Sequence, residues 1–300
     1  MGTFKNWLKA FRLRTLPLAL SSILLGGFLS AYTKNFDWLV TSLAVVTTTL
    51  LQILSNLAND FGDFKAGTDN DDRVGPTRTV QGGDISEQSM KVAIRVFIGL
   101  SLISGSTLIY FATKDMSIGN FIAFFVLGLL AIAAAVNYTM GNNPYGYKGY
   151  GDFFVLVFFG FVGVLGTYYL NAHTLSLNLF LPALALGLMS TAVLNLNNMR
   201  DIENDKQSGK ITLVVKYGIV KSKIYHILIV LGALFLAFIF SYQNFESYWQ
   251  YLFLLTTPLF IKDLIQIYKN KNPKELDPFL KKQAIHTLLF SITFGLGLIL

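Results

Sequence analysis

Nine long apolar runs constrain the fold of this chain more than any other feature. They cover roughly residues 15–32, 37–58, 92–113, 117–138, 153–171, 176–198, 222–241, 247–268 and 283–300. Runs of about 18 or more apolar residues are typical of membrane-spanning helices, and 53% of the 300 residues are hydrophobic while only 14% are charged. A β-barrel would show alternating segments of about ten residues instead. The sequence therefore predicts one all-α, polytopic membrane domain over residues 1–300.

The distribution of lysine and arginine tests this layout. Cytoplasmic segments of membrane proteins carry most of the basic residues. With a cytoplasmic N-terminus, 22 of the 24 basic residues fall in or beside inside segments, and only Lys34 and Lys114 lie outside. We therefore predict nine helices with the N-terminus inside and the C-terminus outside. The net charge of +7 follows from this topology and from contact with anionic lipid, so it does not indicate a nucleic-acid partner.

Two aspartate-rich segments follow the second and the sixth apolar runs. The first contains Asn56, Asn59, Asp60 and Asp63 and continues through Asp69, Asp71, Asp72 and Arg73. The second contains Asn197, Asn198, Arg200, Asp201 and Asp205. Carboxylates at a membrane boundary are costly and mark a functional site by default. The equivalent positions of the two segments, four helices apart, also suggest two related four-helix halves plus a ninth helix.

Helical spacing indicates what these segments bind. If both helices continue through their polar ends, each gathers its amides and carboxylates on one face: Asn56, Asp60 and Asp63 at i, i+4 and i+7, and Asn197, Asp201 and Asp205 at i, i+4 and i+8. Glu203 would then point away from the second face. Mg²⁺ prefers oxygen ligands and is commonly held by one or two carboxylates plus substrate phosphate. We predict that Asp60, Asp63, Asp201 and Asp205 hold Mg²⁺.

Cations interleave with these acids on the same side of the membrane. They include Arg73, Arg78, Lys148, Arg200, Lys206 and Lys210. Arginine and lysine are the usual partners of phosphate oxygens, so the set predicts a diphosphate clamp that stabilises an ionised leaving group. Two alternatives stay open: Asp69, Asp71, Asp72 and Glu203 as solvated surface, and Arg73, Arg200 and Lys206 as anchors of membrane topology.

A cluster of tyrosines lies at the inside edge of the fourth and fifth runs, next to Lys148 and Asp152. Its members are Tyr138, Tyr145, Tyr147 and Tyr150. Interfacial tyrosines are common, but this group could also form a pocket for a flat aromatic substrate or shield a carbocation. Asp152 is either a helix N-cap or a residue of the site.

Several long motifs resemble a known family. They are Asn56-Leu-Ala-Asn-Asp-Phe-Gly-Asp-Phe-Lys-Ala-Gly-Thr-Asp69, Asp72-Arg-Val-Gly-Pro-Thr-Arg78, the Gly141–Asp152 segment, the Val193–Lys206 segment and Gly209-Lys-Ile-Thr-Leu-Val-Val. Over residues 10–220 the chain resembles the 1,4-dihydroxy-2-naphthoate polyprenyltransferases of menaquinone synthesis, a branch of the UbiA-type intramembrane prenyltransferases. The last helices match only in apolar character. Gly67 stands where the wider superfamily commonly has a further aspartate, and Asp69 follows two residues later.

The resemblance implies nine helices around a central cavity in a bacterial cell (inner) membrane, with the active site facing the cytoplasm. It implies transfer of a polyprenyl group from polyprenyl diphosphate to 1,4-dihydroxy-2-naphthoate, with loss of diphosphate and CO₂ to give demethylmenaquinol. The four aspartates would hold Mg²⁺ beside the amides of Asn56, Asn59, Asn197 and Asn198. Arg78, Lys148, Arg200 and Lys210 would neutralise the diphosphate. No obligate protein partner is implied.

Two alternative functions are weighed against this expectation. A sister enzyme would prenylate 4-hydroxybenzoate or another acceptor, against which the Gly75–Arg78 and Tyr145–Lys148 segments argue. A secondary transporter would place its carboxylates near the bilayer midplane at broken helices. Both aspartate-rich segments lie instead at one boundary and are crowded by cations, which favours the enzyme.

Overall fold

The computed structural model describes residues 2–69 and 75–300, so Arg73, Asp71 and Asp72 lie outside the described residues. Within these ranges nine helices are long and apolar enough to span a membrane. They are Phe4–Tyr32, Trp38–Lys65, Glu87–Thr113, Ile118–Asn137, Gly151–Ala172, Leu177–Arg200, Leu213–Gln243, Tyr248–Lys269 and Pro273–Ile299. The prediction of an all-α chain with nine spans is confirmed.

The first half of the chain combines straight spans with two composite ones. The first span joins α1 (Phe4–Phe11), η1 (Leu13–Thr15) and α2 (Leu16–Tyr32) through Arg12, whose φ of 49° ends α1. The next three spans are α3 (Trp38–Lys65), α4 (Glu87–Thr113) and α5 (Ile118–Asn137). After the short η2 (Tyr145–Lys148), the fifth span changes helix type twice: α6 (Gly151–Val155), the π-helix η3 (Leu156–Gly166) and α7 (Thr167–Ala172).

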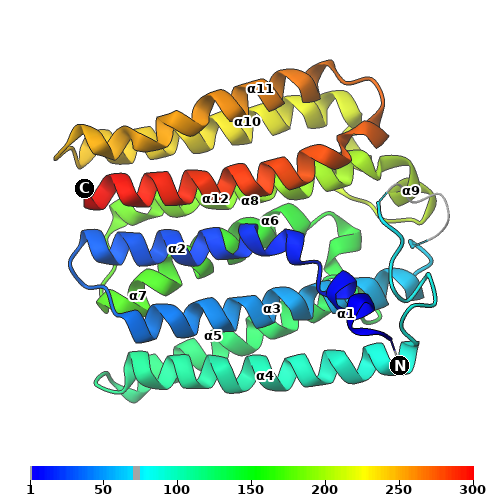
Figure 1. The fold of residues 1–300 in the computed structure, drawn as a ribbon, viewed down its shortest axis with the longest axis horizontal. Helices are drawn as coiled ribbons and strands as arrows, with labels where there is room; N and C mark the ends of the chain where they lie inside the picture. Colours follow the sequence, from blue (N-terminus) through cyan, green and yellow to red (C-terminus); the bar gives the residue numbers. More distant parts are fainter. Residues whose placement is uncertain (1, 70–74) are drawn as a thin grey trace.

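The second half contains four further spans. Its elements are η4 (Leu177–Leu179), α8 (Phe180–Arg200), α9 (Ile202–Gln207), α10 (Leu213–Gln243), η5 (Tyr248–Thr256), α11 (Thr257–Lys269), η6 (Pro273–Leu276) and α12 (Asp277–Ile299). The N-terminus, α1 and α9 lie at one end of the bundle and the C-terminus at the other (Figure 1). The end that holds the N-terminus, α1 and α9 also carries both aspartate-rich segments, and we name it the polar end.

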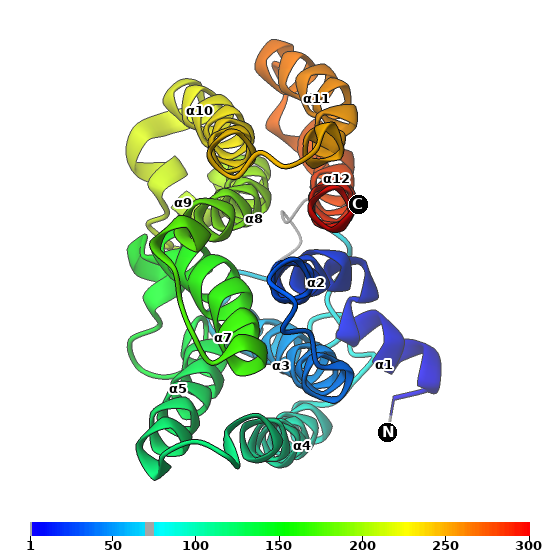
Figure 2. The same cartoon turned by 90° about the vertical axis from the view of Figure 1, so that its left-hand side faces the viewer.

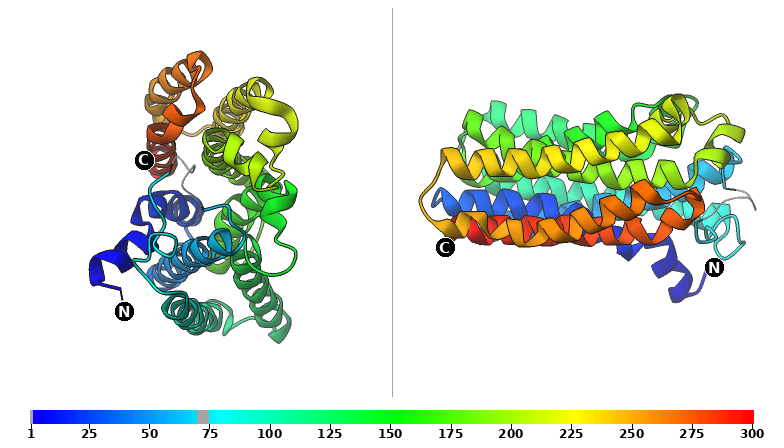
Figure 3. Two further views of the ribbon diagram at one scale, coloured as in Figure 1. Left: turned by 90° about the vertical axis from the view of Figure 1, so that its right-hand side faces the viewer. Right: turned by 90° about the horizontal axis from the view of Figure 1, so that it is seen from above.

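Seen end-on, α2, α3, α7, α8 and α12 occupy the middle of the bundle (Figure 2). Helices α4 and α5 flank them on one side and α10 and α11 on the other, and the two further views of the bundle agree (Figure 3). Contacts of η3 with α2 and α8, and of α12 with the same two helices, connect the two halves. The described residues of α5 include none that is buried, as expected of a helix at the lipid-facing edge.

Small residues allow the central helices to approach closely. A Cβ added at Gly26 on α2 would lie 2.6 Å from the carbonyl oxygen of Val164 on η3. A Cβ added at Gly187 on α8 would lie 2.9 Å from the carbonyl oxygen of Leu156. Such contacts leave no room for a side chain, and small residues at helix interfaces are the usual packing device in membranes. These glycines therefore fix η3 between α2 and α8.

The helices extend beyond the predicted apolar runs mainly at the polar end. Helix α3 continues to Lys65 instead of ending near residue 58, and α4 begins at Glu87 instead of residue 92. Ser86 caps α4 by accepting a hydrogen bond from the amide of Ser89 at 3.3 Å. Apolar runs mark only the part of a helix that lies in hydrocarbon, so polar turns that project beyond the membrane escape them.

Candidate active site

A cavity of about 450 Å³ runs through the bundle between α2, α3, α4, α5, η3, α8 and α12. Its polar end is lined by Asn59, Asp63, Arg78, Asn197 and Lys210. Its other end is lined by apolar side chains of α2, α3, α4, α5 and α7, among them Ile23, Ala44, Leu108, Phe124 and Leu170. One cavity therefore joins a charged compartment at the polar end to an apolar channel inside the membrane span.

The first aspartate-rich segment divides its side chains between two tasks. Helix α3 runs unbroken through it, and Asp60 and Asp63, about 60° apart around the helix axis, contact different neighbours. Asp60 Oδ2 accepts hydrogen bonds from the Thr79 amide at 3.2 Å and the Thr79 hydroxyl at 2.6 Å. Asp63 instead lines the cavity, and its Oδ1 accepts a hydrogen bond from the Tyr147 hydroxyl at 2.9 Å. Asp60 thus anchors the following loop, while Asp63 faces the site.

The amides of α3 also bind neighbouring segments. Asn56 Nδ2 donates to the Phe11 carbonyl at 2.9 Å and to the Thr15 hydroxyl at 3.0 Å, which ties the first span to α3. Asn59 Oδ1 accepts a hydrogen bond from the Thr139 hydroxyl at 3.1 Å. Both asparagines line the cavity, so they hold its wall as well as facing its interior.

The second aspartate-rich segment departs from the prediction of one continuous helix. Helix α8 ends at Arg200, Asp201 has φ −97° and ψ 11°, and α9 begins at Ile202. The expected straight stripe of Asn197, Asp201 and Asp205 on a single helix is therefore wrong. The kink turns the two aspartates toward different partners.

Asp201 pairs with the preceding arginine. Arg200 Nε and Nη2 donate to the two oxygens of Asp201 at 2.8 and 2.6 Å, and Nη1 donates to Asp277 on α12 at 2.5 Å. Nη2 also donates to Asn197 Oδ1 at 3.0 Å. Arg200 is buried, so two carboxylates compensate its charge inside the protein. The structure places this guanidinium in a joint between α8 and α12.

Asp205 and Asp63 face a lysine between them. Lys210 Nζ lies 3.5 Å from Asp205 Oδ1 and 5.6 Å from the centre of the Tyr147 ring. Burial raises the pKa of Asp205 to about 6. Burial also opposes the charge on Lys210, but Asp205 and then Asp63 outweigh it and raise the pKa of the ammonium group above its usual value. The two aspartate-rich segments thus meet across one buried cation.

Hydrogen bonds join three loops around this centre. Asn204 Nδ2 donates to the Thr68 carbonyl at 2.8 Å, and the hydroxyls of Thr68 and Tyr147 lie 2.6 Å apart. The Ile211 amide donates to the Tyr147 carbonyl at 2.9 Å. Arg78 lies between two acids, with Nη2 3.8 Å from Asp63 Oδ2 and Nε 3.5 Å from Asp69 Oδ1. Hydrogen bonds therefore connect the segments after α3 and α5 with α9 and the segment that follows it, at the polar end of the cavity.

The aromatic prediction is partly realised. Tyr138 and Tyr145 line the cavity with ring centres 5.3 Å apart, and the Tyr145 ring lies 4.1 Å from that of Phe154. Burial raises the pKa of Tyr138 to about 12, so its hydroxyl stays protonated at neutral pH. Tyr150 is exposed. These rings form an aromatic wall directly beside the charged compartment.

Other predicted residues lie away from the cavity lining. Lys148 is exposed, and Asn198 is buried. Asp152 is buried and accepts a hydrogen bond from the Tyr225 hydroxyl at 3.1 Å. Glu203 is exposed, as predicted for a residue that points away from the site. The structure therefore brings Asp63, Asp205 and Lys210 together but not these four.

The cavity also has lining residues that sequence reasoning missed. They are Arg12, Arg14, Gln52 and Lys281. Arg12 and Arg14 stand immediately before the first apolar run, where basic residues are ordinary topology signals. Lys281 belongs to the last helix, outside the matched motifs. Only the tertiary fold, which packs η1 and α12 against each other, reveals their common location.

The donor atoms fit a divalent cation that shares its coordination with a substrate. Within residues 2–69 and 75–300, no group of three or more His, Cys, Asp or Glu side chains is arranged to hold a metal. Asp205 Oδ2, however, is buried without a hydrogen-bond partner in these ranges, and Asp205 and Asp63 approach from opposite segments. Mg²⁺ commonly takes one or two carboxylates and completes its shell with phosphate and water. The described residues suit such a shared site and not a closed protein cage.

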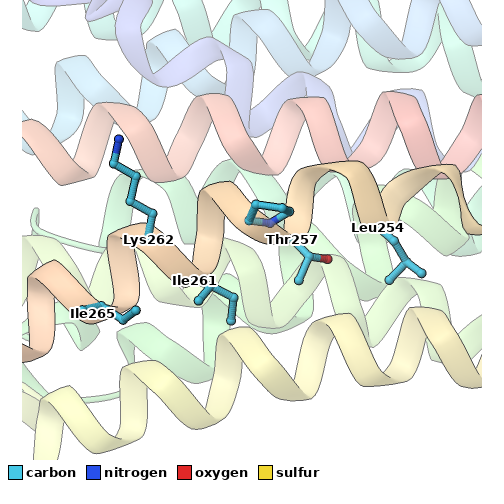
Figure 4. A pocket seen from close by; sticks show the side chains of 6 residues that line it. Leu254, Thr257, Ile261, Lys262 and Ile265 are labelled. Atoms are coloured by element: carbon cyan, nitrogen blue, oxygen red, sulfur yellow. The ribbon is translucent and has the colours of Figure 1, made fainter.

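A second hollow, of about 660 Å³, lies along the outside of α11 (Figure 4). Its lining comprises Leu254, Thr257, Pro258, Ile261, Lys262 and Ile265. Most of these side chains are exposed and apolar, and they lie within a predicted span. The hollow carries no cluster of polar groups, so its character is that of a lipid-facing surface.

Comparison with known proteins agrees with this arrangement. The chain matches the UbiA prenyltransferase family over residues 19–291. It is 45% identical to the 1,4-dihydroxy-2-naphthoate octaprenyltransferase of Escherichia coli, covering 98% of this chain and 95% of the relative. It is 44% identical to the protein of the same name from Haemophilus influenzae, covering 99% and 96%.

Solved structures share the fold. The apo UbiA homolog from Aeropyrum pernix superposes with a TM-score of 0.70 at 16% identity, covering 96% of this chain and 98% of that one. The UbiA homolog from Archaeoglobus fulgidus bound to GPP and Mg²⁺ gives 0.63 at 16% identity, covering 98% and 99%. With a family match across most of the chain and relatives above 40% identity along its whole length, the chain belongs to the UbiA prenyltransferase family.

Proposed function

We propose that this protein transfers a polyprenyl group from polyprenyl diphosphate to 1,4-dihydroxy-2-naphthoate, releasing diphosphate and CO₂ and forming demethylmenaquinol. The observation that carries the proposal is the single cavity that joins Asp63, Arg78 and Lys210 to an apolar channel. A molecule with an anionic head and a long apolar tail fits both compartments at once. The relatives named for this reaction, at 45% and 44% identity, supply the acceptor.

The charged compartment suits the diphosphate. Asp63 and Asp205 would hold Mg²⁺, and Asp60 and Asp201 would support them by fixing the Thr79 segment and the Arg200 joint. When bound, the metal neutralises charge on the leaving diphosphate. Arg78 and Lys210 stand beside the same acids and would bind the phosphate oxygens as charge develops there. The Mg²⁺-bound homolog from Archaeoglobus fulgidus supports a metal in this fold.

The aromatic wall suits the reacting carbons. Breaking the bond between the allylic carbon and the diphosphate oxygen leaves an allylic cation. Tyr138, Tyr145 and Phe154 line the cavity beside the charged compartment, and aromatic faces stabilise cations where water is excluded. The electron-rich naphthoate ring then forms a bond to this carbon at the position bearing its carboxylate. Cleavage of the carboxylate bond returns its electron pair to the ring and releases CO₂.

The distribution of basic residues supports one direction of the protein in the membrane. Arg12, Arg14, Arg78, Lys210 and Lys281 all line the cavity, and they belong to the segments that the charge distribution places on the inside. We infer that the polar end faces the cytoplasm of a bacterial cell. The diphosphate headgroup of the donor and the naphthoate would enter the cavity from that side.

Product analysis tests this function. Purified protein in detergent or bilayers, supplied with Mg²⁺, octaprenyl diphosphate and 1,4-dihydroxy-2-naphthoate, is expected to give a product whose mass matches prenyl addition with loss of CO₂. A parallel reaction with 4-hydroxybenzoate serves as the control and is expected to give no product. Turnover of 4-hydroxybenzoate without turnover of the naphthoate would overturn the proposed acceptor.

A further inference from the structure

Three glycines follow one another at intervals of three residues in and beside the π-helix, and only one of them lacks a packing reason. A Cβ at Gly160 would lie 2.7 Å from the carbonyl oxygen of Ala183, and one at Gly163 would lie 2.7 Å from Ser22 Cβ. A Cβ at Gly166 would meet no atom within 4 Å. Gly160 and Gly163 are therefore required by helix contacts, whereas Gly166 is not.

The backbone does not require glycine at this position either. Gly166 has φ −62° and ψ −48°, which every residue type adopts in a helix. Glycine inside a helix is unfavourable relative to alanine, because it loses more conformational freedom on folding. Gly166 does line the cavity. The structural consequence of glycine here is thus open space inside the cavity.

The helix that contains Gly166 lines the cavity with a stripe of residues whose side chains decrease in size. Phe154, Phe158, Val162 and Gly166 all line it and stand four residues apart. In a continuous α-helix, residues four apart drift by about 40° per step, and the wider turn of the π-helix reverses this drift. The change of helix type within the span leaves all four positions on the cavity wall, and side-chain size falls from Phe154 to Gly166.

The opposite walls of the channel are also open near their glycines. Gly105 on α4 and Gly128 on α5 line the cavity, and a Cβ added at either would have its nearest neighbour at 3.7 or 3.9 Å. Gly166 lies twelve residues beyond Phe154, at most about 18 Å along the helix axis. A short prenyl group attached at the charged compartment ends before this level, and a long one must pass it.

We propose that Gly166 is a specificity-determining residue that admits long prenyl chains, by leaving the channel open at the level where a short chain has already ended. The inference rests on the proposed function, because it takes the diphosphate to bind at the charged compartment. It assigns chain-length selection to one position of the π-helical span. A larger side chain at residue 166 then lowers kcat/KM for long prenyl donors relative to short ones.

The experiment compares two donors on matched variants. Gly166→Leu fills the channel, Gly166→Ala adds a single methyl group, and Gly99→Leu is the control. Gly99 is a helical glycine of α4 whose added Cβ also meets no atom within 4 Å, but it lies outside the cavity lining. Each protein is assayed for kcat/KM with geranyl and with octaprenyl diphosphate, both with the naphthoate acceptor. Thermal unfolding establishes that each variant is folded.

For Gly166→Leu, kcat/KM with octaprenyl diphosphate is expected to fall at least about tenfold because a filled cavity excludes the chain, with less than about threefold change for geranyl diphosphate. Gly166→Ala should show a smaller change in the same direction, and it keeps the test valid should the leucine variant fail to fold. Gly99→Leu should leave the ratio of the two donors unchanged. Equal loss with both donors, an unchanged ratio at residue 166, or the same shift in Gly99→Leu would overturn the inference. Absence of naphthoate prenylation by the unmodified protein with either donor would instead overturn the proposed function.

Discussion

The two aspartate-rich segments use the same division of labour on different backbones. In the first, on the unbroken helix α3, Asp60 holds the Thr79 segment and Asp63 lines the cavity. In the second, across the kink between α8 and α9, Asp201 holds Arg200 and Asp205 approaches Lys210. Each segment therefore has one carboxylate that supports the fold and one directed at the centre. Similar spacing in the sequence does not mean that all four carboxylates do the same thing.

The supporting carboxylates differ in what they bind. Asp60 receives neutral donors, namely the amide and hydroxyl of Thr79 and the Val80 amide at 3.5 Å. Asp201 receives a buried guanidinium that also binds Asp277. Removal of a neutral hydrogen-bond acceptor leaves unpaired dipoles, whereas removal of an ion-pair partner leaves an uncompensated charge. The second segment should therefore be the more sensitive in stability.

The largest effect is expected for the two central carboxylates. Asp63→Asn and Asp205→Asn should each lower kcat at least about 100-fold, because each removes a charge that would hold Mg²⁺ against the diphosphate. The unfolding midpoint in the presence of EDTA should fall less than in Asp201→Asn, since Lys210 keeps the other central carboxylate as a partner in either variant. Initial rates at saturating Mg²⁺, together with unfolding midpoints, measure both quantities. Near-normal rates in either variant would refute the metal assignment.

A strong loss of stability is expected for Asp201→Asn. Arg200 would keep Asp277 and Asn197 but lose the negative charge of Asp201 and one of the two oxygens that accept from its Nε and Nη2. Breaking a buried ion pair by removing one partner costs about 3 kcal/mol or more. The unfolding midpoint should fall clearly below that of Asp205→Asn, which serves as the matched comparison. Equal midpoints in the two variants would erase the proposed difference between supporting and central carboxylates.

A smaller loss of stability is expected for Asp60→Asn. The amide oxygen can replace one carboxylate oxygen, but the NH₂ group would then face the backbone amide of either Val80 or Thr79. An unsatisfied buried donor costs about 1–3 kcal/mol, so the midpoint should fall less than in Asp201→Asn. Limited proteolysis should also cut the chain faster between α3 and α4. An unchanged proteolysis rate would show that Asp60 does not anchor this loop.

The sequence predicted the spans and the polar side of the site because both depend on local patterns. A run of apolar residues identifies a membrane helix without reference to its neighbours. The lysine and arginine distribution predicts on which side of the membrane each loop lies. The partners of the carboxylates could not be predicted in this way. Thr79 reaches Asp60, Tyr147 reaches Asp63 and Asp277 reaches Arg200 only through packing of distant segments. Asp277, at the start of the last span, lies beyond the motifs that carried the family resemblance.

The kink at Asp201 shows a second limit of sequence reasoning. The spacing of Asn197, Asp201 and Asp205 is compatible with one helix, and backbone hydrogen bonds from Asp201 to Asn197 and from Asp205 to Asp201 persist across the break. Nothing in the local pattern indicates that Arg200 turns back to bind Asp201 and a third residue on α12. The partner of the Asp201 carboxylate thus depends on a guanidinium that also binds α12, which helix periodicity alone does not show.

The smallest expected effect concerns Lys210, the cation that the central carboxylates of the two aspartate-rich segments share. In metal-free protein, Lys210→Met should lower the unfolding midpoint by the equivalent of about 1 kcal/mol, since Asp63 and Asp205 lose a common cation while Arg78 stays beside Asp63. Added Mg²⁺ should restore most of this loss and should stabilise the variant more than the unmodified protein. Lys206→Met is the control, because Lys206 is exposed on α9 and its removal should change neither value. An identical Mg²⁺ response in all three proteins would mean that Lys210 does not compensate the two carboxylates, and that the loops meet through the hydrogen bonds of Tyr147, Thr68 and Asn204 alone.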